Sequence, residues 1–147
     1  IATYWKPYHD QVEAEISRLR ERHKRVVLWD GHSIRSHVPR FFDGRLTDFN
    51  LGTAGGSSCD PALAALIEAE HAAANAFTSV MNGRFKGGYI TRSYGNPDKG
   101  VHAIQLELSQ ITYMEETLPF RYLPDSAEAA KAVISRLLQT ALAWAAA

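Results

Sequence analysis

The sequence predicts an α/β fold of three layers, in which helices cover both faces of a mostly parallel central sheet. Two segments carry this prediction: Val26–Trp29 is a continuous apolar run of β-forming residues, and His102–Leu108 alternates apolar with polar residues. Segments with helical periodicity separate and flank them. Strands that alternate with helices in this way are typical of α/β proteins.

The first helix is expected from about residue 4 to residue 24. Pro7 is compatible with it, because a proline in the first turn removes an N–H group that has no partner there. The basic run 18–25 is expected to be the solvated end of this helix, where cations interact favourably with the helix dipole. The apolar positions that recur at helical spacing are Tyr8, Val12, Ile16 and Leu19.

A buried strand and a long loop region are expected next. Val26–Trp29 is apolar throughout, which predicts a strand buried on both faces. The polar group Asp30–Ser33 is expected to end it. Residues 34–60 contain several glycines and a proline and predict loops, with a brief strand at Phe49–Gly52.

A second helix and two strands follow. Asp60 and Pro61 supply an N-cap and a proline at the first helical position, so they predict a helix that runs to about Met81. Gly87–Tyr94 and His102–Leu108 are expected to be strands on either side of a turn.

The last helix is expected after an irregular, aromatic stretch at 113–124. Asp125 and Glu128 have the spacing of a capping box, with aspartate in place of the usual serine or threonine. The apolar positions of this helix are Ala129, Val133, Leu137, Leu138 and Leu142.

Composition narrows the class of protein. The 147 residues suit one domain, and 46% apolar residues argue against a disordered chain. Sixteen basic residues balance sixteen acidic ones, so the sequence lacks the basic excess that nucleic acids and anionic membranes attract. No apolar run reaches the roughly 18 residues that a membrane span needs. The sequence carries no signal for an oligomeric state.

The single cysteine gives information about the cellular compartment. Cys59 alone excludes an intrachain disulfide and a cysteine-based zinc site. A single cysteine fits a reducing compartment, and no signal peptide is visible. We therefore expect a cytoplasmic protein.

The first candidate for chemistry is the polar group after the Val26–Trp29 strand. His32 can present a ring nitrogen to a metal, and Asp30 can orient that ring as a hydrogen-bond partner of the ligand. Gly31 between them permits a tight turn and the close approach of a ligand. A hydrogen-bonded structural histidine is the more frequent role of a lone histidine at such a place.

The second candidate is a carboxylate in the alternating strand. Alternation places Gln105 and Glu107 on the face opposite Leu106 and Leu108. A carboxylate on an interior strand is costly unless it is paired or hydrated, which makes Glu107 a candidate general base with a tuned pKa. A salt bridge to an arginine is an equally good interpretation.

Three cations lie between these candidates. Arg92 follows a glycine-rich segment and could hold a carboxylate with two guanidinium N–H groups. Arg84 and Lys86 are further candidates for the same task. From the residues alone, an ordinary surface arginine is the better interpretation of Arg92.

Five segments resemble the N-formylglutamate amidohydrolases, the deformylases of histidine degradation, in the same order and from end to end of the chain. The combination is more specific than any one motif. The segments are Trp5–Val12, Val26–Ile34, Thr47–Thr53, Lys86–Gly95 and His102–Met114.

The resemblance implies a metal-dependent hydrolase that cleaves N-formyl-L-glutamate to formate and L-glutamate. It implies a fold similar to that of the zinc carboxypeptidases, with His32 as a ligand of a divalent metal such as zinc and Glu107 as general acid and base. Arg92 would hold substrate, with Arg84 behind it. His9 belongs to a motif of the family to which no role is assigned.

Two departures from the family pattern shape the expectation. The Pro-His-Ser-Gly segment that carries other metal ligands is absent, and so is an upstream Asn-Arg pair. We therefore expect residues 1–147 to be one domain that forms the C-terminal portion of a longer N-formylglutamate amidohydrolase domain. A catalytic zinc needs about three protein ligands, so the chain in isolation is expected to be inactive and metal-free.

Two other functions stay open. One is a related metallohydrolase that acts on another N-acyl amino acid or on a peptide C-terminus. The other is a non-catalytic remnant that keeps the fold.

Overall fold

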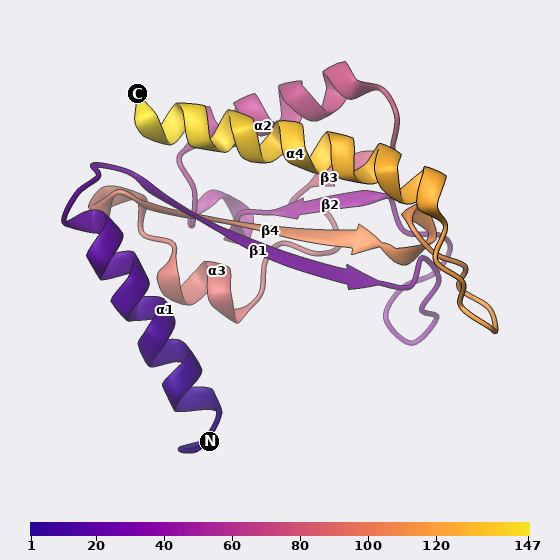
Figure 1. Cartoon of the computed structure of the whole chain (residues 1–147), viewed down its shortest axis with the longest axis horizontal. Helices are drawn as coiled ribbons and strands as arrows, with labels where there is room; N and C mark the ends of the chain where they lie inside the picture. The colour runs from indigo at the N-terminus through magenta and orange to yellow at the C-terminus, as the bar shows by residue number, and fades with distance from the viewer.

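A computed structural model describes all residues from 1 to 147 as a mixed α/β structure built on one four-stranded sheet. The strand order is β1-β4-β2-β3 (Figure 1). The main elements are α1 (Trp5–Arg20), β1 (Val26–Ile34), β2 (Phe49–Gly52), α2 (Pro61–Ala74), β3 (Ser79–Met81), α3 (Tyr89–Tyr94), β4 (Val101–Ser109) and α4 (Pro124–Ala146).

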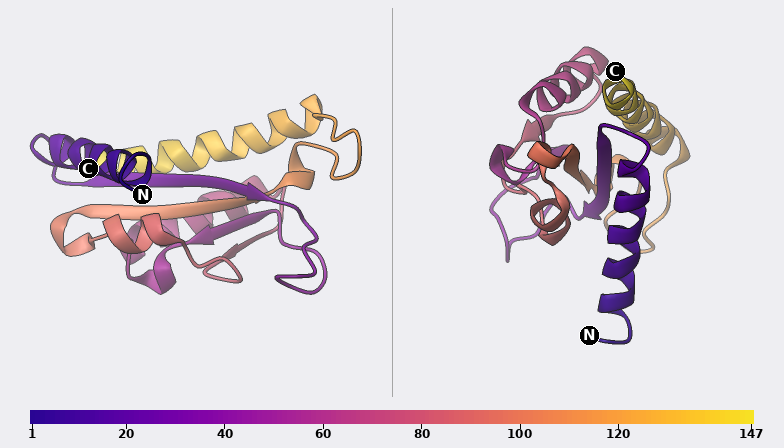
Figure 2. Two further views of the ribbon diagram at one scale, coloured as in Figure 1. Left: turned by 90° about the horizontal axis from the view of Figure 1, so that it is seen from below. Right: turned by 90° about the vertical axis from the view of Figure 1, so that its left-hand side faces the viewer.

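The sheet is mixed, whereas the sequence predicted a mostly parallel one. β1 pairs with β4 and β2 pairs with β3 in parallel, but β2 and β4 run antiparallel. Helices lie on both sides of the sheet: α2 and α4 cover one face, and α3 lies on the other (Figures 1 and 2). α1 extends away from the sheet beside β1 (Figure 2).

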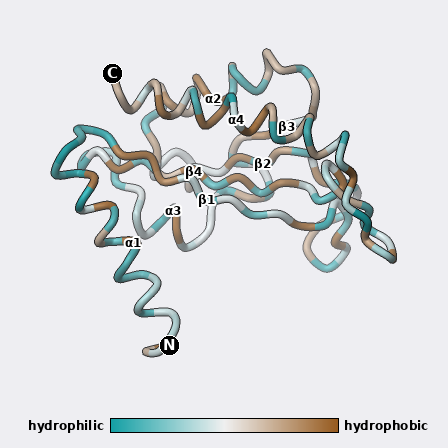
Figure 3. The backbone as a smooth tube through the Cα atoms, viewed as in Figure 1, coloured by the Kyte–Doolittle hydropathy of each residue, from teal (hydrophilic) through white to brown (hydrophobic).

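The core lies between the sheet and the α2/α4 layer. Alternate residues of β2 and β4 point into it and meet apolar residues of the two helices. Figure 3 marks hydrophobic stretches in brown along these strands and helices. The fully buried large side chains of this core are Phe49, Leu51, Leu63, Ile67, Ile104 and Leu137.

The strand β1 differs from its prediction in length and burial. It continues to Ile34, because it pairs with β4 over nine positions, so Asp30 and His32 lie inside the strand. It is also one of the two edge strands of the sheet, and Val26 is its only buried residue. The strand buried along its whole length is β4.

Two other elements were predicted wrongly. The helix that starts at Pro61 ends at Ala74, because Asn75 adopts the left-handed conformation, and Ser79–Met81 forms β3 instead. The segment expected to be a strand at Gly87–Tyr94 is the short helix α3. Gly88 turns the chain into that helix, and the Thr91 hydroxyl donates a hydrogen bond back to the Gly88 carbonyl at 3.0 Å.

The start of the last helix was also predicted wrongly. α4 begins at Pro124, and Leu123 occupies the N-cap position without a side-chain hydrogen bond. Asp125 therefore lies in the first turn, where a negative charge interacts favourably with the helix dipole, rather than at the cap. None of the helices has the length and apolar character needed to cross a membrane.

A close backbone approach at Gly52 supports a stability prediction. A Cβ atom at this position would lie 2.5 Å from the backbone nitrogen of Gly87. We expect Gly52→Ala to lower the free energy of unfolding by about 1–3 kcal/mol, since the neighbouring backbone must shift. Urea denaturation measures this loss. Gly31→Ala is the control, because nothing lies within 4 Å of its Cβ position; equal losses in the two variants would contradict the prediction.

Candidate active site

A row of polar side chains lies on the face of the sheet opposite the core. The register places Asp30 beside Gln105 and His32 beside Glu107, across the β1–β4 pair. From the other side of β4, Asn50 of β2 is also opposite Glu107. Residues of neighbouring strands that lie opposite each other point to the same face, so these five side chains share one surface.

His32 is held by Asp30. Its Nε2 atom lies 2.9 Å from Oδ1 of Asp30, two residues back on the same strand. The imidazole is half exposed, whereas the Asp30 carboxylate is mostly covered. This contact orients the ring and leaves Nδ1 as the nitrogen without a carboxylate partner.

Glu107 is the buried carboxylate of this face, with 8% of its surface exposed. Burial raises the pKa of the Glu107 carboxyl above its ordinary value, and the charge of Asp30 acts in the same direction. The nearby His32 and a hydrogen bond from Gln105 lower that pKa in part. No arginine forms an ion pair with Glu107, so the salt-bridge interpretation finds no partner. A raised pKa brings a carboxyl group closer to the pH range in which a general acid or base works best.

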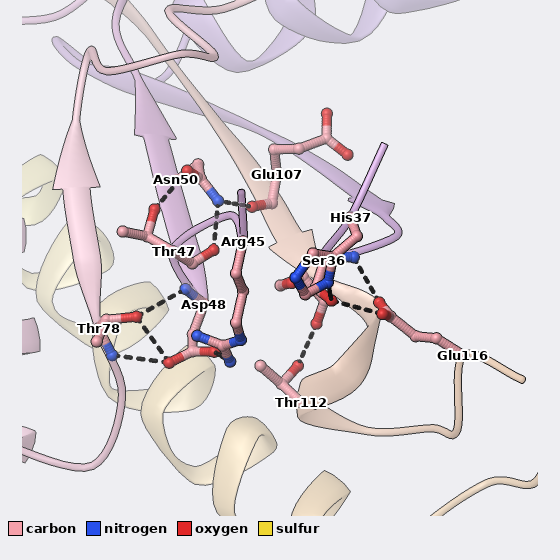
Figure 4. A network of polar contacts seen from close by, with 11 residues as sticks. Ser36, His37, Arg45, Thr47, Asp48, Asn50, Thr78, Glu107, Thr112 and Glu116 are labelled. Carbon is pink, nitrogen blue, oxygen red and sulfur yellow. Dashed lines mark hydrogen bonds and ion pairs between the residues drawn. The ribbon is translucent and has the colours of Figure 1, made fainter. Parts of the chain in front are cut away.

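Asn50 supports the backbone at Glu107, a role that sequence analysis missed. Its Nδ2 donates to the Glu107 carbonyl at 3.1 Å and to the Thr47 carbonyl at 2.8 Å, and its Oδ1 accepts from the Thr47 hydroxyl at 2.6 Å. Figure 4 shows the Glu107 carboxylate pointing away from these bonds. The sequence signal for this role was the polar Asn50 between the apolar Phe49 and Leu51 in a short strand.

Two further networks hold the loops at this end of the sheet (Figure 4). Ser36, just after β1, donates its backbone N–H and its hydroxyl to the two carboxylate oxygens of Glu116. Asp48, just before β2, accepts from Arg45 at 2.6 Å and from the Thr78 hydroxyl at 2.8 Å. Burial alone would raise the pKa of Asp48, but these donors hold it below its ordinary value. Neither network was predicted from the sequence.

The predicted substrate cations form no ion pair with Glu107 and hydrogen-bond to backbone carbonyls instead. Arg92 donates from Nη1 to the Gly87 carbonyl at 3.0 Å, and Arg84 donates from Nη1 to the Phe41 carbonyl at 3.2 Å. Both therefore serve the backbone of nearby loops in this structure. Their role toward substrate stays a prediction.

His9 connects α1 to α3. It is the only buried residue of α1, and its Nδ1 shares a hydrogen bond with the Tyr94 hydroxyl. Its ring also packs against Tyr89 and Trp5. The segment Trp5–Val12, to which the family resemblance assigned no role, thus contains a packing residue, His9, that holds α1 against α3.

The polar face does not form a complete metal site. No group of three or more histidine, cysteine, aspartate or glutamate side chains is arranged to hold a metal ion. His32 offers one imidazole nitrogen, and a catalytic zinc uses about three protein ligands. These residues alone therefore do not fit a resident zinc ion.

Two apolar grooves, of about 330 and 250 Å³, lie elsewhere. They follow β1 where it meets α4 and α1, and they share Leu19, Val26 and Val27. Neither includes His32 or Glu107.

Comparison with known proteins gives one family. The N-formylglutamate amidohydrolase family matches residues 1–114. The N-formylglutamate deformylase of Pseudomonas aeruginosa is 59% identical over 144 residues, which cover 98% of this chain and 54% of that protein. The N-formylglutamate deformylase of Pseudomonas putida is 56% identical over 142 residues, covering 97% and 53%.

A solved structure gives the same result. The crystal structure of N-formylglutamate amidohydrolase from Ralstonia eutropha JMP134 superposes with a TM-score of 0.80 at 25% identity, over 96% of this chain and 52% of that one. The chain thus spans about half the length of the relatives that it matches. It belongs to the N-formylglutamate amidohydrolase family.

Proposed function

We propose that this chain is part of an amidohydrolase that cleaves N-formyl-L-glutamate to formate and L-glutamate, in the degradation of histidine in the cytoplasm. The observation that carries the proposal is the pairing of His32 with Glu107 across β1 and β4, in a chain that is 59% identical to a protein named N-formylglutamate deformylase. Because the chain spans about half of that relative, the proposed activity belongs to the longer protein.

Glu107 is the proposed general acid and base. Burial raises the pKa of its carboxyl, so the group can take a proton from the attacking water and later deliver it to the departing amine of glutamate. Transfer to that amine is needed because an amide nitrogen leaves poorly without a proton. Arg92 and Arg84 are proposed to bind the two carboxylates of the substrate, after exchanging their present backbone partners for it.

His32 is proposed as one ligand of a divalent metal such as zinc, with Asp30 orienting the ring. The other ligands would come from the half of the relatives' length that this chain does not span. A fold similar to that of the zinc carboxypeptidases is part of the same proposal.

A chimera tests the activity. The segment of the P. aeruginosa deformylase that matches this chain is replaced by the chain itself, and formate release from N-formyl-L-glutamate is measured. We expect turnover comparable to that of the parent enzyme, since 59% identity over 98% of the chain preserves most contacts. A folded but inactive chimera would reject the proposal. N-acetyl-L-glutamate and short peptides serve as competing substrates, and faster turnover of either would favour a related metallohydrolase.

Removal of the proposed ligand should reduce metal content. His32→Ala in the chimera is expected to cut bound zinc by about tenfold or more, because a site with three protein ligands loses one of them. Elemental analysis after exhaustive dialysis measures this. His23→Ala is the control, since His23 lies in the turn after α1. Undiminished zinc in the His32 variant would overturn the assignment.

A further inference from the structure

We infer that Gln105 is a positioning residue for Glu107: the backbone N–H of Gly88 fixes the orientation of its side-chain amide, which directs the NH₂ group to one oxygen of the Glu107 carboxylate. The effect of Gln105 on catalysis rests on the proposed function. The geometry itself stands on two hydrogen bonds and on burial.

The side chain of Gln105 is enclosed and has a partner at each end. Only 6% of the residue is exposed. Its Oε1 accepts from the Gly88 N–H at 2.6 Å, and its Nε2 donates to Oε2 of Glu107 at 3.3 Å. An amide oxygen only accepts and an amide nitrogen only donates, so the Gly88 bond excludes the flipped orientation. The donor must then face the carboxylate.

Gly88 is itself held in place. It immediately precedes α3, and its carbonyl accepts from the hydroxyl of Thr91, which is fully buried. The far end of α3 is fixed because Tyr94 bonds to His9. A Cβ atom at Gly88 would lie 3.2 Å from Oε1 of Gln105, so a larger residue would crowd the bond.

The arrangement restrains one oxygen and leaves the other free. Bound at Oε2, the Glu107 carboxylate loses part of its rotational freedom, while Oε1 has no hydrogen-bond partner within the chain. A base held in one orientation reacts faster than one that must find it, whereas substrate binding gains nothing from this restraint. Loss of the bond should therefore lower kcat and leave KM unchanged.

Nuclear magnetic resonance on the isolated chain tests the geometry without any assay of activity. We expect slow hydrogen exchange at the Gln105 side-chain NH₂ and a nuclear Overhauser contact between it and the Gly88 N–H. In Glu107→Ala, exchange at the NH₂ should accelerate by about tenfold, while the Gly88 N–H stays protected. Fast exchange in the unmodified chain, or no change in Glu107→Ala, would overturn the inference.

Kinetics of the chimera test the catalytic meaning. Gln105→Met keeps the volume but removes both hydrogen bonds, and we expect kcat to fall about tenfold with KM unchanged, because a bond to a charged group is lost. Gln110→Met is the matched control in the turn that follows β4. A rise in KM at constant kcat, or no change in either, would overturn the positioning role. If the unmodified chimera is inactive while the NH₂ group is protected, the proposed function fails and the Gln105 geometry stands.

Discussion

Glu107→Gln in the chimera should lower kcat for N-formyl-L-glutamate by about 10²–10⁴-fold, the usual contribution of a general acid or base. Glutamine keeps the shape of the side chain and can still meet the Gln105 amide, but it cannot take up a proton. Bound zinc and KM should stay unchanged, because no metal contact or substrate contact is assigned to this carboxylate. Formate release at saturating substrate measures the effect.

Glu68→Gln is the matched control, since Glu68 is exposed on α2 and forms no ion pair. It should leave kcat unchanged. A Glu107→Gln enzyme that keeps its turnover would remove Glu107 from the mechanism.

The same substitution should stabilise the fold at neutral pH. Burial raises the pKa of Glu107 above its unfolded value of 4.5, so the ionised form is penalised only in the folded protein. At pH values below 4.5 both states carry the neutral acid, and Glu107→Gln should match the unmodified chain. As the pH rises through the raised pKa, the unmodified chain should lose stability relative to the variant. Urea unfolding at several pH values measures this difference, and a variant that is less stable at pH 7 would contradict the argument.

The position of His32 opposite Glu107 could be predicted from the sequence only in part. The alternation in 102–108 predicted that Leu106 and Glu107 lie on opposite faces, and the structure places Leu106 in the core and Glu107 outside it. The polar residues 30–33 were correctly singled out as a candidate site on β1. The apolar residues at the start of β1, however, wrongly predicted a strand buried on both faces. Hydropathy of a short run does not distinguish an edge strand packed by helices from a central one, because both can be apolar.

The elements that were predicted wrongly depend on contacts between distant parts of the chain. Tyr89, Ile90 and Thr91 favour strands by propensity, yet they form the short helix α3, which follows the close approach of Lys86 and Gly87 to Gly52. Strand order likewise depends on long-range pairing, which no local pattern encodes. The supports of the site, Asn50 and the Gly88 N–H, were missed because each acts on Glu107 or Gln105 from a distant part of the chain.

Phe49→Ala should lower the free energy of unfolding by about 3–5 kcal/mol, the range for a large aromatic side chain removed from a core. Phe49 is fully buried on β2, between β4 and β3, and its ring packs 4.9 Å from that of His71 and 5.3 Å from that of Phe77. Truncation leaves a cavity between the sheet and α2 that these neighbours fill only in part. Because domains are typically stable by about 5–15 kcal/mol, the variant should unfold at a much lower urea concentration.

Phe41→Ala gives the matched comparison, because Phe41 is 56% exposed in the loop after β1. Its loss should stay within about 0.5 kcal/mol, as for most surface substitutions. Equal losses at the two positions would mean that the core does not lie where β2 meets the α2/α4 layer. The polar face depends on that core, since the alternation that buries Phe49 and Leu51 is what turns Asn50 toward Glu107. A strand that slipped by one residue would exchange the two faces and remove the site together with the core.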